Sequence, residues 1–169
     1  MKRLAAVCVV AAALLAACSP HHHTAPDPVL EPTGAESLPT WERSTDAGTA
    51  TATLTIPADL LFATDSAALS PAAVDLLGTV AVEAQPATAR VHVEGFADSD
   101  GDAAHNQALS ERRAEAVAQW LGANGVNPQA ITTQGWGETR PAVPETDEAA
   151  KAKNRRVVVT VTNKQGEQR

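Results

Sequence analysis

Residues 95–114, GFADSDGDAAHNQALSERRA, hold the side chains best suited to bind a small charged ligand. Asp98 follows an alternating apolar segment, 90–96, and Arg113 comes fifteen positions later in a stretch with helical spacing. A loop of this length can turn back on itself, so the carboxylate and the guanidinium can face each other across a cleft. One acid opposed to one base is poorly suited to breaking bonds. It suits a ligand that carries both an ammonium and a carboxylate.

The helical periodicity places Arg113 on the buried side of its helix. Arg113 stands four positions after Leu109 and four before Val117, whereas Arg112 is turned towards solvent. A charge that faces inward needs a partner, because an unpaired buried charge is costly. Asp98 is the nearest candidate. The sequence therefore predicts that Asp98 and Arg113 oppose each other, either as a ligand clamp or as a structural salt bridge.

The same loop allows two rival interpretations. Residues 98–102, DSDGD, have the spacing that opens a calcium loop, but Ala103 and Leu109 stand where that loop needs Gly and Glu. An enzyme could use the acids with His105 for acid–base chemistry, but no strand–turn nucleophile elbow accompanies them. We therefore predict a binding protein without a metal, a cofactor or catalytic residues.

Strand and helix patterns alternate over residues 51–165, the predicted folded domain. The strand patterns cover 51–56, 90–96, 131–134 and 155–162, and the helical patterns cover 71–84, 107–123 and, more briefly, 147–153. Ser70 and Pro71 are residue types typical of a helix N-cap and a first helical position. The alternation predicts an α+β, two-layer sandwich: a mixed sheet of about four strands with two to three helices on one face.

The first 18 residues have the pattern of an export signal that ends at a cysteine. Lys2 and Arg3 precede an apolar run, 4–17, which is shorter than the roughly 20 residues that span a bilayer. The run ends in Leu-Ala-Ala-Cys18, which resembles a bacterial lipobox. We predict cleavage after residue 17 and lipid on the Cys18 sulfur, since two or more acyl chains give stable anchoring. Cys8 is lost with the signal, so no disulfide is expected.

Residues 18–50 are rich in Pro, Thr, Ser and Ala and have no apolar period, which is typical of an extended tether. His21–His23 lack a further ligand nearby and are interpreted as solvated. Residues 166–169 are predicted to be a short tail. The net charge of −7 at pH 7 argues against nucleic acid or an anionic membrane surface as the general partner.

The chain resembles the OmpA-like C-terminal domain, the peptidoglycan-associating module also found in Pal lipoproteins and flagellar stator proteins. The matching residues follow the family's order over about 55–163. They are Phe62, Asp65-Ser66, the GFADSDGD loop, Asn106 with LSERRA, Gly135-Trp-Gly-Glu138 and Asn154-Arg-Arg-Val157. Taken together, these motifs are specific to the family, whereas any one of them alone would be weak.

The resemblance implies non-covalent binding of the peptidoglycan stem peptide at its meso-diaminopimelate. Asp98 would accept hydrogen bonds from the diaminopimelate ammonium, and Arg113 would bind its carboxylate with the planar fork that lysine lacks. At the positions matching the family's motif, Asn106 would shape the pocket and Arg155 would border it.

These features together predict a lipoprotein of the cell envelope that ties a membrane to the cell wall. The expected partners are peptidoglycan, the membrane through acylated (palmitate-bearing) Cys18, and other envelope proteins, with no nucleic acid. Ser19 is not the Asp that often retains lipoproteins at the inner membrane, which favours the outer membrane, facing the periplasm. Two alternatives remain open: an envelope scaffold that binds proteins without binding the wall, and a cell-wall hydrolase.

Overall fold

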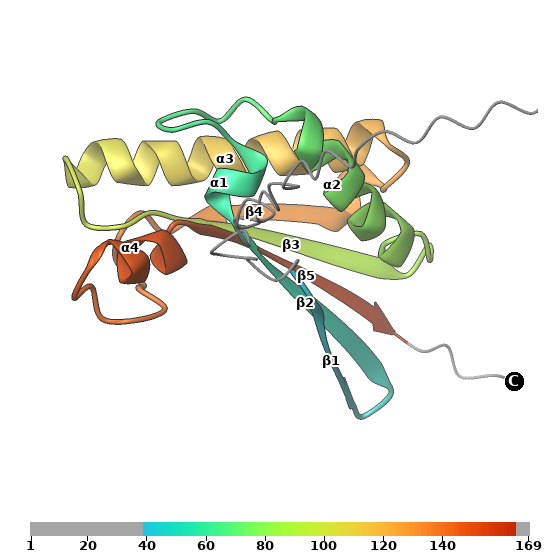
Figure 1. The fold of residues 1–169 in the computed structure, drawn as a ribbon. Coiled ribbons are helices and arrows are strands. Elements are labelled where there is room, and N and C mark those ends of the chain that lie inside the picture. Colours follow the sequence, from blue (N-terminus) through green and yellow to red (C-terminus); the bar gives the residue numbers. More distant parts are fainter. Residues whose placement is uncertain (1–38, 165–169) are drawn as a thin grey trace, which may run out of the picture. The chain divides into compact units, whose positions relative to one another are not determined.

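A computed structural model describes residues 39–164, which form a five-stranded mixed sheet with helices packed on it (Figure 1). The strands are β1 Trp41–Asp46, β2 Thr49–Pro57, β3 Ala89–Phe96, β4 Ile131–Gly135 and β5 Arg156–Lys164. The helices are α1 Ala58–Leu61, α2 Pro71–Glu83, α3 Ala103–Ala123 and α4 Glu148–Asn154, with a 3-10 turn, η1, at Pro128–Ala130. The strand order is β1-β2-β5-β3-β4. Within the described residues, β3 and β4 pair in parallel, and the other three neighbouring pairs of strands are antiparallel.

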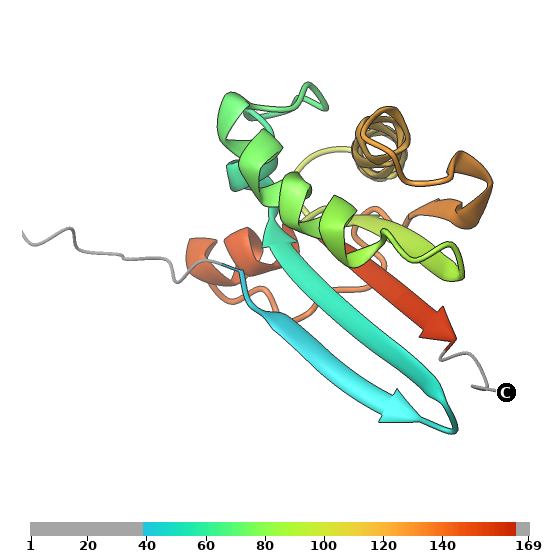
Figure 2. The same ribbon diagram turned by 90° about the vertical axis from the view of Figure 1, so that its right-hand side faces the viewer.

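Alternating apolar residues on the strands build the core beneath α2 and α3, which lie over the same face of the sheet (Figure 2). The fully buried side chains of this core include Leu54, Ile56, Leu77, Val80, Val91, Val93, Val117, Leu121, Val157, Val159 and Val161. Because successive strand side chains point to opposite faces, only every second residue enters this core. The predicted α+β two-layer architecture is confirmed.

Strand β1 corrects the predicted strand count, which was about four. It lies inside residues 18–50, which we expected to be tether throughout, and pairs antiparallel with β2, with Trp41 opposite Leu54. Trp41 packs against the core, and the Arg43 guanidinium lies 5.7 Å from the Trp41 ring centroid and 3.1 Å from a Glu83 carboxylate oxygen. The predictions for residues 1–17, Cys18 and the tail 166–169 lie outside the described residues.

The turn between β1 and β2 contains one strained residue. Asp46 pairs with Thr49, so Ala47 and Gly48 form a two-residue turn with φ of 44° and 78°. A positive φ costs an L-residue roughly 1–2 kcal/mol, and Asn-Gly is the pair that such turns prefer. We expect Ala47→Asn to raise the free energy of unfolding by about 0.5–1 kcal/mol in urea denaturation. Gly48→Ala should lower it, and equal stability of both variants would contradict this explanation.

The helices begin where side chains cap them. Ser70 accepts a hydrogen bond from the Ala73 amide at 3.1 Å, which confirms the predicted N-cap. Helix α3 begins four residues earlier than predicted, because Asp102 accepts from the amides of Ala104 and His105, both at 3.0 Å. The early start places the first turn of α3 beside the loop that follows β3.

Strand pairing brings three distant chain segments to one end of the sheet. Arg156, the first residue of β5, lies opposite Phe96 at the end of β3 and opposite Pro57 at the end of β2. Asp59 follows β2, Asp98 follows β3, and Arg155 directly precedes β5. Antiparallel register therefore gathers these charged side chains at the same edge.

Candidate functional site

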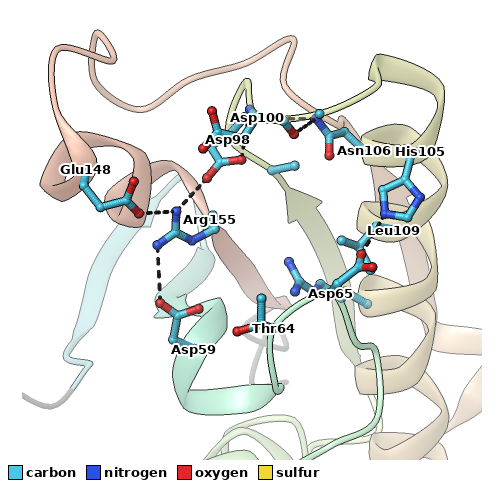
Figure 3. Close-up of a pocket in the computed structure, with 13 residues that line it drawn as sticks. Asp59, Thr64, Asp65, Asp98, Asp100, His105, Asn106, Leu109, Glu148 and Arg155 are labelled. Atoms are coloured by element: carbon cyan, nitrogen blue, oxygen red, sulfur yellow. Dashed lines mark hydrogen bonds and ion pairs between the residues drawn. The ribbon is translucent and has the colours of Figure 1, made fainter.

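A cavity of about 590 Å³ opens at this end of the sheet (Figure 3). Its charged and amide side chains come from α1 and the loop after it, from the loop after β3, from α3, and from α4 with the residue after it. They are Asp59, Asp65, Asp98, Asp100, His105, Asn106, Arg113, Glu148 and Arg155. The four predicted site residues of the folded domain, Asp98, Asn106, Arg113 and Arg155, thus line one cavity.

The direct partner of Asp98 is Arg155. The Arg155 Nη1 donates to the Asp98 Oδ2 at 2.6 Å, and Asp98 is 7% exposed. Burial alone would lower the pKa of Arg155, but hydrogen bonds to Asp98 and Glu148 raise it above its ordinary value. Our expectation that Arg113 would be the partner of Asp98 is corrected here: the two residues share the cavity, but the ion pair of Asp98 is with Arg155.

Arg113 is held at its base and left open at its tip. It is 4% exposed, its Nε donates to the Ser66 carbonyl oxygen at 2.9 Å, and its guanidinium carbon lies 5.3 Å from the Phe62 ring centroid. No carboxylate of the described residues lies within 4.0 Å of it. Burial lowers its pKa, partly opposed by the charges of Asp59 and Asp65. A buried guanidinium with free terminal nitrogens beside a cavity can bind a carboxylate through both of them.

Asn106 fixes the shape of the loop after β3. Its side-chain amide nitrogen donates to the carbonyl oxygens of Asp98 and Asp100, at 3.2 and 2.9 Å. The same nitrogen donates to the Glu138 Oε2 at 2.9 Å. Asn106 is 4% exposed, and Glu138 lies in the loop after β4. These hydrogen bonds therefore connect α3 both to the loop after β3 and to the loop after β4. Asn106 therefore holds Asp98 in place through the backbone.

The loop after β3 is also held from the side of α4. Lys151 Nζ lies 2.5 Å from the Asp100 Oδ1. Glu145 accepts hydrogen bonds from the amide and hydroxyl of Ser99 and from the side-chain amide of Asn154. Asn154 in turn accepts from the amides of residues 142 and 143. These contacts connect the segment before α4 to the loop that carries Asp98.

The Glu145 contact is expected to open in acid. The hydrogen bond from the Ser99 hydroxyl, ahead of the opposing effect of burial, holds the pKa of Glu145 below its ordinary value of 4.5. Because the pKa of Glu145 is lowered in the folded protein, the contact contributes its full stability at pH values above the ordinary carboxyl pKa. That stability is lost as the pH falls through the lowered pKa and the carboxylate is protonated. We expect the protection of the Ser99 amide, measured by NMR relative to its intrinsic exchange rate at each pH, to fall once the pH drops below the ordinary range of a glutamate carboxyl. Glu145→Gln should remove this pH step, and an unchanged step would contradict the assignment.

The three acids of the DSDGD loop turn to three different partners. Asp98 pairs with Arg155, Asp100 with Lys151, and Asp102 caps α3. Within residues 39–164, no group of three or more His, Cys, Asp or Glu side chains is arranged to hold a metal ion. In the same part of the chain, no helix combines the length and apolarity needed to cross a membrane.

Two carboxylates of the cavity, Asp59 and Glu148, are not among the predicted site residues. Glu148 lies 2.9 Å from the Arg155 Nη1, and Asp59 lies 3.6 Å from its Nη2. Glu148 stands seven positions before Arg155, two helical turns, so its spacing was a usable signal. Asp59 had no such signal in the sequence. It lies near Arg155 because β2 pairs with β5, which no local spacing predicts.

Comparison with known proteins places this geometry in a family context. The sequence model of the OmpA family matches residues 61–155. The chain is 47% identical over 78 residues to the peptidoglycan-associated lipoprotein of Pasteurella multocida, which covers 46% of this chain and 51% of that protein. It is 38% identical over 104 residues to the peptidoglycan-binding protein ArfA of Mycobacterium bovis, covering 60% of this chain and 32% of that protein.

The fold is also similar to that of a solved structure, the cell wall anchor of the T6SS from Pseudomonas aeruginosa. The TM-score is 0.62 at 28% sequence identity, over 73% of this chain and 87% of that one. The chain spans about half of the length of the Pasteurella relative and about a third of the mycobacterial one. The similarity therefore concerns the domain that carries the cavity.

Proposed function

This chain belongs to the OmpA family, and from that premise we propose that it binds peptidoglycan non-covalently and ties a membrane to the cell wall. The relatives named as peptidoglycan-associated or peptidoglycan-binding proteins support this proposal. The ligand is the meso-diaminopimelate of the stem peptide, which carries an ammonium and a carboxylate on one carbon. The protein binds this group and does not cleave the wall.

One observation carries the proposal: the buried guanidinium of Arg113 opens into the cavity that the carboxylate of Asp98 also lines. In this proposal the diaminopimelate carboxylate occupies the free nitrogens of Arg113. Its ammonium lies on the acidic side of the cavity, next to the carboxylate of Asp98. Asn106 contributes by fixing the backbone of the loop rather than by touching the ligand.

Sedimentation with insoluble peptidoglycan tests this function. The full chain should co-sediment with peptidoglycan that contains diaminopimelate, and free meso-diaminopimelate should compete. Peptidoglycan with lysine in the same position is the matched control and should retain much less protein, since its side chain has no carboxylate for Arg113. Equal retention on both walls would overturn the ligand assignment. Release of soluble wall fragments would indicate a hydrolase instead.

The membrane attachment in this proposal depends on Cys18. The sequence Leu-Ala-Ala-Cys18 supports cleavage before the cysteine and acylation of its sulfur. We expect the protein made in a lipoprotein-processing bacterium to incorporate labelled palmitate and to fractionate with membranes. Cys18→Ala should lose both properties while the protein still binds peptidoglycan. Palmitate incorporation by the Cys18→Ala variant would show that the anchor lies elsewhere.

A further inference from the structure

We infer that Asp59 and Glu148 form, together with Asp98, a subsite that receives the ammonium of the ligand. This inference rests on the proposed function and adds two binding residues to it. The three carboxylates come from segments far apart in the sequence: α1, the first residue of α4, and the loop after β3. All three line the same cavity (Figure 3).

The three carboxylates surround a single cation. Arg155 contacts the Asp98 Oδ2 at 2.6 Å, the Glu148 Oε1 at 2.9 Å and the Asp59 Oδ2 at 3.6 Å. Figure 3 shows Arg155 in the middle, with the carboxylates of Asp59, Asp98 and Glu148 directed towards it. In the described part of the chain, Arg155 is the one cation within 4.0 Å of these three carboxylates, so the acids outnumber the cation that they contact. An ammonium that enters the cavity beside these carboxylates would be attracted to them.

The other acids of the cavity already have their own partners. The Asp65 Oδ1 lies 2.7 Å from the His105 Nε2, and Asp100 pairs with Lys151 at 2.5 Å. The surplus negative charge is therefore concentrated on the side of Arg155, and it is this side that attracts an ammonium. Side chains of Asp59 and Glu148 are 62% and 72% exposed, so both are accessible to a ligand from solvent.

Arg113 indicates where the carboxylate of the same ligand would lie. It is nine-tenths buried, and its terminal nitrogens have no carboxylate partner among the described residues. Asp59 is the carboxylate with the largest electrostatic effect on it, although the two are not in contact. A carboxylate bound to Arg113 would thus lie near the acidic group. This arrangement fits a ligand whose ammonium and carboxylate sit on the same carbon.

The test pairs protein variants with altered ligands. Binding of a soluble diaminopimelate-containing stem tripeptide to the full chain is measured by calorimetry, with Asp59→Asn, Glu148→Gln and the double variant. Because both side chains are exposed, each single change should weaken binding by about 3- to 5-fold and the double change by about tenfold. Asp75→Asn and Glu115→Gln, which remove exposed charges elsewhere, should leave binding unchanged.

A tripeptide without the diaminopimelate ammonium tests whether Asp59 and Glu148 contact that group. When the free amine of the diaminopimelate residue is acetylated, with the tripeptide N-terminus blocked in both ligands, Asp59→Asn and Glu148→Gln should no longer change the affinity, because the group they bind is gone. Equal losses with both ligands, or no loss with either, would overturn the subsite. Failure of the unaltered chain to bind the tripeptide would instead overturn the proposed function, and the subsite with it.

Discussion

Replacing Arg113 by lysine is expected to weaken binding to peptidoglycan by about 10- to 100-fold. The guanidinium is anchored through its Nε to Ser66 and stacked near Phe62, which leaves two parallel N–H groups for a carboxylate. Lysine keeps the charge but has a single side-chain nitrogen. It therefore cannot donate to the Ser66 carbonyl oxygen and also bind a carboxylate through two parallel N–H groups. Co-sedimentation over a range of peptidoglycan concentrations measures the loss.

Arg112 provides the matched control on the same helix. It is exposed, and it does not line the cavity. Arg112→Lys should therefore bind like the unaltered chain and unfold at the same temperature. If Arg113→Lys also binds like the unaltered chain while remaining folded, the carboxylate contact assigned to Arg113 is wrong.

Gly95→Ala is expected to lower the free energy of unfolding by at least about 3 kcal/mol. Helix α3 crosses β3 so closely that a Cβ on Gly95 would lie 2.1 Å from the Ser110 carbonyl oxygen and 2.9 Å from its carbon. Both are backbone atoms of a buried helical residue and cannot move aside without shifting the helix. Thermal denaturation should show a melting temperature lower by on the order of 10 °C.

Gly78 provides a control of opposite sign. It lies inside α2, and a Cβ there would meet nothing within 4 Å. Gly78→Ala should stabilise the protein by about 0.5–1 kcal/mol, because alanine loses less conformational freedom in a helix. If Gly95→Ala were as stable as Gly78→Ala, the close approach of α3 to β3 would not exist.

Much of the fold could be predicted because its strands and helices have regular patterns. The alternation in β3 and the spacing of Leu109, Val117 and Leu121 on α3 each identify one buried face. Strand β1 was missed because Trp41–Asp46 lies at the sheet edge and all but Trp41 are exposed, so it has no apolar alternation. Its place depends on pairing with β2, which short-range patterns do not report.

The members of the site could be predicted better than their contacts. Helical spacing identified Arg113 as inward-facing, and the family motifs pointed to Asn106 and Arg155. Spacing could not decide whether Asp98 contacts Arg113 or Arg155, because that depends on how β5 is aligned beside β3. Local sequence predicts which face a side chain is on, whereas long-range register decides which charges meet.

The strand order has a consequence for how the protein is made. Strand β5 comes last in the described sequence but lies in the middle of the sheet, between β2 and β3. A nascent chain that lacks it would have two disconnected halves, each with an open edge and no finished hydrophobic interior. Such a chain should stay unfolded until β5 is available to join the two halves. The cavity would then first exist once β5 has been made and has joined the sheet.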